Sequence, residues 1–333
     1  MADTLQRTVR IFSASDVRQA LPMAEAIAVM KATFAILSRG EAVLPLRTHI
    51  EVAKHRGNAL FMPSYLPSED RLGIKVLTLF EGNADRGLPR IQSLMLLLDG
   101  ATGSPLALMD GASLTAIRTG AASGAATDLL ARPDASVVVI FGAGVQGRTQ
   151  LEATCCVRTI RHAWIVDPNA EAAREFAREM SDRLQVEVRV ALSAAEGVRD
   201  ADILCTATVA RTPVFAHADL KPGVHINAIG SYQPAVREIP EETVARARIV
   251  VDHRVSALAE AGDLIVPLNK GIIQASALQT ELGEIACGAK RGRTSAHDIT
   301  LFKSVGVAIQ DLAAAARVLQ RGVELRLGTQ AQF

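Results

Sequence analysis

The chain has 333 residues, with 36 Lys and Arg against 35 Asp and Glu, which gives a net charge of +1. Hydrophobic residues make up 49% and charged residues 21%, so the chain can bury a sizeable core and is not disordered as a whole. The near-zero charge leaves no overall electrostatic signature of binding to nucleic acid or to an acidic membrane. A chain of this length favours about two domains.

Targeting and redox signals are weak. The longest apolar runs, 94–98 and 137–141, fall far short of the ~18 residues of a membrane-spanning helix. The N-terminus lacks the apolar stretch of a secretory signal. The four cysteines show no C-x-x-C spacing and the seven histidines no metal-ligand spacing. These features favour a reduced, cytoplasmic protein with no bound metal and no membrane or nucleic-acid partner.

The first 110 residues contain extended segments, with strands expected at 71–79 and 92–98. Residues 113–131 are rich in small side chains and predict a helix that packs closely against its neighbours. The pair Arg132–Pro133 is expected to end that helix.

Beyond residue 130, strand-like and helical segments alternate. This order predicts a parallel sheet with helices on both faces. The expected strands are 136–141, 162–167, 186–191, 201–208, 224–230 and 248–253, and the clearest expected helix is 170–184. The apolar spacing over 299–322 predicts one long final helix that leaves this sheet and packs on the first domain.

A glycine-rich turn follows the strand at 136–141. Gly142, Gly144 and Gly147 have G-x-G-x-x-G spacing between an expected strand and an expected helix. Gly142 would permit the tight turn, and Gly144 would let a pyrophosphate approach the backbone. Gly147 would let the helix pack closely on the sheet. The free N–H groups at the helix start would then bind phosphate. The alternative is a sharp turn without a ligand.

Asp167 ends the next strand and could accept hydrogen bonds from both ribose hydroxyls of a dinucleotide. That role favours NAD(H), because a 2′-phosphate would face a carboxylate. Asp167 could also cap the following helix, since Pro168 comes next, and the two roles are compatible because the helix starts where the strand ends. Arg148 follows the glycines and could contact phosphate, so NADP(H) stays possible.

Taken together, several motifs resemble the ornithine cyclodeaminase/μ-crystallin family over nearly the whole chain. They are GIKVL, TA-x-RTGA-x-S, GAG-x-Q, INAIGSYQPAVREIP and F-K-S-x-G-x-A-x-x-D. The resemblance implies an α/β fold, in which a Rossmann-type doubly wound parallel sheet is inserted in an α+β substrate-binding and dimerisation domain. It implies residues 1–125 plus 312–333 for the substrate domain, residues 126–311 for the dinucleotide domain, and a homodimer.

The resemblance also implies a site for the α-carboxylate of a small imino or amino acid, held by Arg47, Lys75 and Arg118. A guanidinium fork matches a carboxylate, and Lys adds a point charge. Lys75 lies between apolar neighbours and Arg118 among small ones, so an exposed position without a partner is the less favoured alternative. Arg47 could equally be an ordinary edge-strand residue. Val305 is a further expected substrate contact.

Other positions match cofactor contacts of the family, and Thr206 could equally be an ordinary strand threonine. Together with the three glycines, the expected cofactor-binding residues are Val145, Gln146, Asp167, Thr206, Asn227, Ala228 and Ser304.

Two positions depart from family members that cyclise ornithine. Tyr232 stands where those members carry an aspartate, and Arg90 where they carry a small hydroxyl residue. A tyrosine with a pKa of ~10 is a poor base at neutral pH. The segment G-S-Y-x-P-x-x-R-E is more similar to members that reduce cyclic imines.

The expected activity is therefore NAD(P)H-dependent reduction of Δ1-pyrroline-2-carboxylate or Δ1-piperideine-2-carboxylate to L-proline or L-pipecolate. The expected catalytic residues are Lys75, Arg118 and Tyr232, with Lys75, a water molecule or Tyr232 as proton donor. The alternatives are ornithine cyclodeaminase, an amino-acid dehydrogenase such as alanine dehydrogenase, and a non-catalytic ligand-binding protein of the μ-crystallin kind.

Overall fold

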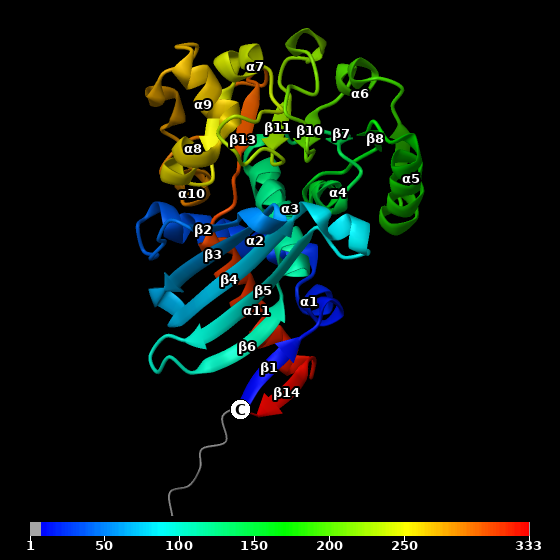
Figure 1. Cartoon of the computed structure of the whole chain (residues 1–333). Coiled ribbons are helices and arrows are strands. Elements are labelled where there is room, and N and C mark those ends of the chain that lie inside the picture. Colours follow the sequence, from blue (N-terminus) through cyan, green and yellow to red (C-terminus); the bar gives the residue numbers. More distant parts are fainter. Residues whose placement is uncertain (1–7, 333) are drawn as a thin grey trace, which may run out of the picture. The chain divides into compact units, whose positions relative to one another are not determined.

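The computed structural model describes residues 8–332, and the chain divides into two compact units (Figure 1). Unit 1 comprises Met1–Arg118 with Val307–Phe333, and unit 2 comprises Thr119–Gly306. The boundaries expected from the sequence are 125/126 and 311/312. The second boundary lies earlier in the structure because Asp311 pairs with side chains of unit 1.

Unit 1 is built on a sheet that has seven strands within the described residues, in the order β14-β1-β6-β5-β4-β3-β2. Neighbouring strands are antiparallel except β1 and β6. Helix α11 packs on β3, β4 and β5, and α1 and α2 pack against α11. The elements are β1 (Thr8–Phe12), α1 (Ala14–Ala20), α2 (Met23–Ser38), β2 (Thr48–Val52), β3 (Gly57–Leu66), β4 (Arg71–Phe80), β5 (Ile91–Asp99), β6 (Pro105–Asp110), α11 (Ala308–Glu324) and β14 (Thr329–Gln332).

The two faces of the unit 1 sheet differ. Side chains alternate along a strand, so Met62, Met95 and Met109 point to the face that α11 covers and are almost fully buried. Leu72 and Leu94 belong to the opposite face, where they are 36% and 53% exposed. One face therefore forms the core of the unit and the other is apolar but open.

Unit 2 is a parallel sheet of seven strands over residues 119–306, all of which the structure describes, in the order β12-β13-β11-β10-β7-β8-β9. The chain passes from β7 outward to β9 and returns to β10 beside β7, so the sheet is doubly wound. The strands are β7 (Val137–Phe141), β8 (His162–Val166), β9 (Glu187–Val190), β10 (Ile203–Thr206), β11 (His225–Ala228), β12 (Arg248–Val251) and β13 (Thr300–Lys303). The helices are α4 (Val145–Val157), α5 (Ala170–Leu184), α6 (Ala194–Arg199), α7 (Glu241–Arg246), α8 (Arg254–Glu260), α9 (Gly262–Asn269) and α10 (Leu282–Ala286), while α3 (Gly111–Leu130) contains the boundary between the units.

The parallel sheet and the strands expected at 71–79 and 92–98 are confirmed. The single helix expected over 299–322 is wrong, because Thr300–Lys303 form β13 between β11 and β12. A central strand that is buried on both faces has no polar alternation, so its apolar run resembles a buried helix. Gly306, at φ 77°, precedes the start of α11 at Ala308.

Among the described residues, no single helix is long and apolar enough to cross a membrane; only the bent pair α1 and α2 reaches that length and composition together.

Candidate functional site

Lys75 lies in the middle of β4 and is 1% exposed, although lysine is rarely buried. Its Nζ lies 2.7 Å from Asp311 Oδ2 and 3.3 Å from Thr115 Oγ1. Burial lowers the pKa of Lys75 to about 8, and Asp311 limits that fall. The ammonium group is therefore held in the protein interior by one carboxylate.

Arg118, on α3, binds the same carboxylate. Its Nε lies 2.9 Å from Asp311 Oδ1, and its Nη1 donates to Gln310 Oε1 at 3.2 Å. Burial alone would raise the pKa of Asp311, but the neighbouring Arg118 and Lys75 lower it. Counting these buried side chains, two cations and one anion leave a charge of 2 − 1 = +1.

Arg47, in the segment before β2, is half-buried, and its positive charge contributes to lowering the pKa of Lys75. The expected trio thus gathers in unit 1. Sequence reasoning missed Asp311, which joins two members of that trio. The available signal was an acidic residue at the end of the F-K-S-x-G-x-A-x-x-D motif, directly before the apolar run 312–316.

Gln310 adds a donor to this cation cluster, which we define as Arg47, Lys75 and Arg118. Its Oε1 accepts from Arg118 Nη1 and from the backbone N–H of Val307 at 2.8 Å, which fixes the orientation of the amide. Its Nε2 is buried and has no hydrogen-bond partner in the part of the chain that the structure describes. A buried donor without an acceptor is costly, so an anionic ligand would satisfy both this N–H group and the surplus charge.

The glycine turn lies in unit 2 between β7 and α4. Gly142 has φ 102°, and a Cβ there would lie 2.5 Å from the carbonyl oxygen of Ala207. A Cβ at Gly147 would overlap the carbonyl oxygen of Gly142, whereas one at Gly144 would meet open space. Gly142 and Gly147 are thus required by the fold, while Gly144 leaves room beside the N–H groups at the start of α4.

Asp167 follows β8. Its two oxygens accept from the backbone N–H groups of Ala143 and Asn169, each at 2.8 Å. The capping role considered for Asp167 is wrong, because Asn169 is the N-cap of α5 and accepts from the N–H groups of Glu171 and Ala172. Each carboxylate oxygen can accept a further hydrogen bond, so Asp167 retains capacity for ribose hydroxyls.

Arg148 is directed to the turn itself. Its guanidinium donates to the carbonyl oxygens of Ala143 and Gly144, pairs with Glu179 at 2.7 Å and stacks over the Phe176 ring. Arg148 therefore stabilises the turn, and the carboxylate of Glu179 already compensates its positive charge.

The remaining expected residues follow neighbouring strands of unit 2. Thr206, Asn227 and Ala228 are fully buried at the ends of β10 and β11, and the Asn227 amide donates to Thr127 at 2.9 Å. Tyr232, in the loop after β11, is 42% exposed. Val145 and Gln146, two further expected cofactor contacts, begin α4. Val145 is exposed and Gln146 is half-buried.

Ser304 and Val305 follow β13 and are held by Asp252. The Ser304 hydroxyl donates to Asp252 Oδ2 at 2.7 Å, and the N–H of Val305 donates to the same oxygen at 2.9 Å. Asp252 is a second residue that sequence reasoning missed.

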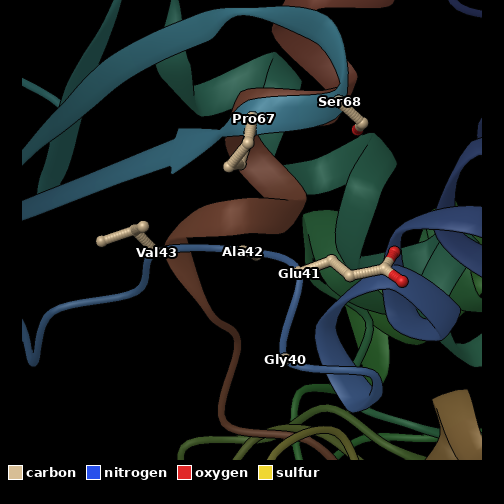
Figure 2. A pocket seen from close by; sticks show the side chains of 6 residues that line it. All are labelled: Gly40, Glu41, Ala42, Val43, Pro67 and Ser68. Atoms are coloured by element: carbon tan, nitrogen blue, oxygen red, sulfur yellow. The ribbon is translucent and has the colours of Figure 1, made fainter.

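A separate open cavity of about 480 Å³ lies in unit 1, next to the segment after α2 (Figure 2). It is lined by Gly40, Glu41, Ala42, Val43, Pro67 and Ser68, none of which belongs to the cation cluster. Within the described residues, no group of three or more His, Cys, Asp or Glu side chains is arranged to hold a metal ion.

Known proteins are similar to this chain over nearly its whole length. The model of the ornithine cyclodeaminase/mu-crystallin family matches residues 8–325. A Δ1-pyrroline-2-carboxylate reductase of Bacillus cereus is 39% identical over 324 residues, 97% of this chain and 99% of that protein.

Two solved structures are similar to this one. The Δ1-pyrroline-2-carboxylate reductase of Thermococcus litoralis, in complex with NADH and L-proline, has a TM-score of 0.93 and 44% identity, and covers 96% of this chain and 99% of that one. An archaeal alanine dehydrogenase dimer with bound NAD has a TM-score of 0.91 and 35% identity, with 98% and 99% covered.

Proposed function

This chain belongs to the ornithine cyclodeaminase/mu-crystallin family, and we propose that it reduces a cyclic α-imino acid with NADH. The substrates are Δ1-pyrroline-2-carboxylate or Δ1-piperideine-2-carboxylate, and the products L-proline or L-pipecolate. The observation that carries this proposal is the buried surplus of positive charge at Lys75 and Arg118, which share the single carboxylate of Asp311.

The cation cluster binds the carboxylate of the substrate. A buried net positive charge is costly unless an anion compensates it, and the guanidinium of Arg118 can donate two parallel bonds to a planar carboxylate. Asp311 holds Lys75 and Arg118 in place, so their orientation is set before the substrate arrives. A carboxylate bound in this way fixes the direction of the adjacent C=N bond, and orientation of this kind contributes much of the rate enhancement in two-substrate reactions.

The glycine turn and Asp167 fit a dinucleotide. The space beside Gly144 admits a pyrophosphate to the N–H groups that begin α4, and the Asp167 carboxylate accepts ribose hydroxyls. When bound, NADH supplies the hydride that is added to the imine carbon. The Asp167 carboxylate favours NADH over NADPH, because it would repel a 2′-phosphate.

Lys75 is the proton donor that the geometry supports best. With a pKa of about 8 it is largely protonated at neutral pH, yet it releases a proton more readily than an ordinary lysine. Where the imine binds unprotonated, Lys75 donates the proton to the ring nitrogen. Tyr232 lies in the other unit on a half-exposed loop. It supports the reductase over the cyclodeaminase because it stands where ornithine-cyclising members carry an aspartate.

The test is a panel of substrates with NADH oxidation and ammonia followed together. We expect oxidation of NADH with Δ1-pyrroline-2-carboxylate or Δ1-piperideine-2-carboxylate, without ammonia release. Ammonia release from L-ornithine with catalytic NAD would establish the cyclodeaminase instead. Ammonia-dependent NADH oxidation with pyruvate would establish an alanine dehydrogenase, the second candidate favoured by the similar archaeal structure. NADH binding without turnover of any of these substrates would indicate a ligand-binding protein.

The open face of the unit 1 sheet supports a homodimer. Alternate residues of β3 to β6 make this face almost entirely apolar, and helices cover only the other face within the described residues. The apolar side chains concerned are Phe61, Pro63, Leu72, Ile74, Val76, Leu94, Leu96, Leu98, Leu106 and Leu108. A continuous apolar face that no helix covers normally marks an interface. Light scattering after gel filtration tests it: the native chain should elute as a dimer and Leu94→Glu as a monomer.

A further inference from the structure

Glu238 is a fully buried residue to which the proposed reaction assigns no role. It ends the G-S-Y-x-P-x-x-R-E segment, in which Tyr232 stands at the position where ornithine-cyclising members carry an aspartate. We propose that Glu238 is a positioning residue that shapes the ends of β10 and β11 to receive the nicotinamide half of NADH. This inference rests on the proposed function and adds a residue that determines how the cofactor is bound.

The carboxylate of Glu238 ties two loops together. Its Oε1 accepts from the backbone N–H of Thr208 at 2.8 Å and from the Thr208 hydroxyl at 2.7 Å. Its Oε2 accepts from the backbone N–H of Ser231 at 3.1 Å and from the Thr206 hydroxyl at 3.0 Å. Thr206 and Thr208 lie at or just after the end of β10, and Ser231 follows β11. One side chain therefore holds the loops that follow two adjacent strands.

The hydrogen-bond pattern requires an acceptor at both oxygens of the side chain. Each oxygen of Glu238 accepts one backbone N–H, and a backbone N–H cannot reverse its direction as a hydroxyl can. A glutamine has only one acceptor oxygen, so its NH₂ group would face either Thr208 N–H or Ser231 N–H. One buried donor would then lose its partner, and the loop that carries it would shift.

Two further residues, Asp263 and Lys303, fix the backbone on either side of this network. Asp263 Oδ1 accepts from the backbone N–H groups of Glu238 at 2.7 Å and Ile239 at 3.0 Å. Lys303, at the end of β13, pairs with Asp263 at 2.8 Å and donates to the carbonyl oxygen of Ser231. The Ser231 residue is thus fixed through its N–H by Glu238 and through its C=O by Lys303.

The packing around this network is tight. A Cβ on Gly230 would lie 2.6 Å from Glu238 Oε1 and 2.6 Å from the backbone nitrogen of Thr208. The two loops therefore touch directly, and displacing one displaces the other.

The strand order indicates which half of the cofactor this network serves. Asp167 follows β8 on one side of β7, whereas β10 and β11 lie on the other side. A dinucleotide bound across the carboxyl edge of a doubly wound sheet places its pyrophosphate at the glycine turn. With the adenosine ribose at Asp167, the nicotinamide half extends along the ends of β10 and β11, where Glu238 acts.

The experiment compares binding of NADH and of ADP-ribose, which lacks nicotinamide, to the full chain and to Glu238→Gln. We expect the dissociation constant for NADH to rise about tenfold, in line with one buried N–H group left unpaired, and that for ADP-ribose to stay within about twofold. Equal weakening of both ligands, or of neither, would overturn the proposal. The readout needs no imine, so it is independent of whether the proposed reduction occurs.

Asp202→Asn is the matched control. Asp202 is also a buried carboxylate, at the opposite edge of the same sheet: its Oδ2 accepts from the backbone N–H groups of Ser136 and Val137, and its Oδ1 pairs with Arg132 and Lys221. It should lower thermal stability and leave the ratio of the two dissociation constants unchanged. If Glu238→Gln fails to fold, Thr208→Val, which removes one hydroxyl donor to Glu238, should change the same ratio in the same direction, and an unchanged ratio would contradict the proposal.

Discussion

Lys75 and Asp311 form an ion pair of 2.7 Å between residues that are 236 positions apart in the chain. The pair joins the middle of β4 to the first turn of α11, so the two chain segments of unit 1 must fold together before Lys75 and Arg118 gain their counter-charge. The stability of the unit and its ability to bind an anion consequently depend on the same contact.

Removing the shared anion should destabilise unit 1 strongly. Asp311→Asn leaves Lys75 and Arg118 buried without a counter-charge, a change that typically costs about 3–5 kcal/mol. We expect a clearly lower urea midpoint by circular dichroism. As a comparison, Glu187→Gln breaks an exposed pair with Arg189 and should not move the midpoint. A stable Asp311→Asn protein would show that the buried cations are compensated in another way.

Arg118→Lys should separate substrate binding from cofactor binding. The guanidinium bonds Asp311 and Gln310 at once and retains donors for a ligand, a geometry that an ammonium group cannot reproduce. We expect kcat/KM for the imino acid to fall about 100-fold, with the dissociation constant for NADH unchanged. Arg39→Lys, at an exposed arginine paired with Glu41, is the control and should retain full activity. Weaker NADH binding in Arg118→Lys would argue against a substrate role.

The protonation of Lys75 should appear in the pH dependence of anion binding. Burial lowers the pKa of Lys75 to about 8, so its positive charge is present below that pH and is lost as the pH rises through it. Affinity for pyrrole-2-carboxylate, an analogue with no imine to titrate, should therefore decline above pH ~8. Lys75→Arg should abolish this decline because arginine stays charged, whereas Tyr232→Phe should retain it. A decline that persists in Lys75→Arg would place the titrating group elsewhere.

Two glycines of the turn should respond differently to a methyl group. Gly144→Ala places its Cβ in open space, so the protein should fold normally but bind NADH more weakly, because the methyl group occupies the path of the pyrophosphate. Gly147→Ala places its Cβ against the carbonyl oxygen of Gly142 and should lower the melting temperature. Fluorescence titration and thermal unfolding of both variants check this. Normal NADH binding by Gly144→Ala would exclude the turn as the phosphate site.

Local patterns predicted much of the fold. The β-branched run at 137–141 followed by the glycine spacing was sufficient to predict β7, its turn and α4. Lys75 and Arg118 could be proposed from the family resemblance, and their apolar or small neighbours favoured buried positions with a partner. The partner itself could not be identified, since Asp311 meets them only through the folding of distant segments.

The residues that were missed share one property. Asp252 and Glu238 each bind a backbone N–H group that is 30 or more positions away in the sequence, those of Val305 and Thr208, and such contacts leave no local signal. The error over 299–303 has a different cause, because a short apolar run carries no periodicity with which to distinguish strand from helix.

The ten residues of strand β4 contribute to both faces of the unit 1 sheet. Lys75 and Gly73 face α11, while Leu72, Ile74 and Val76 face away from it. Inserting or deleting a single residue within the strand would exchange these sets, moving the lysine to the outside and an apolar side chain into the ion-pair position. Length changes should therefore be tolerated only in the hairpin turns, and point substitutions are the available route by which this strand can acquire a new specificity.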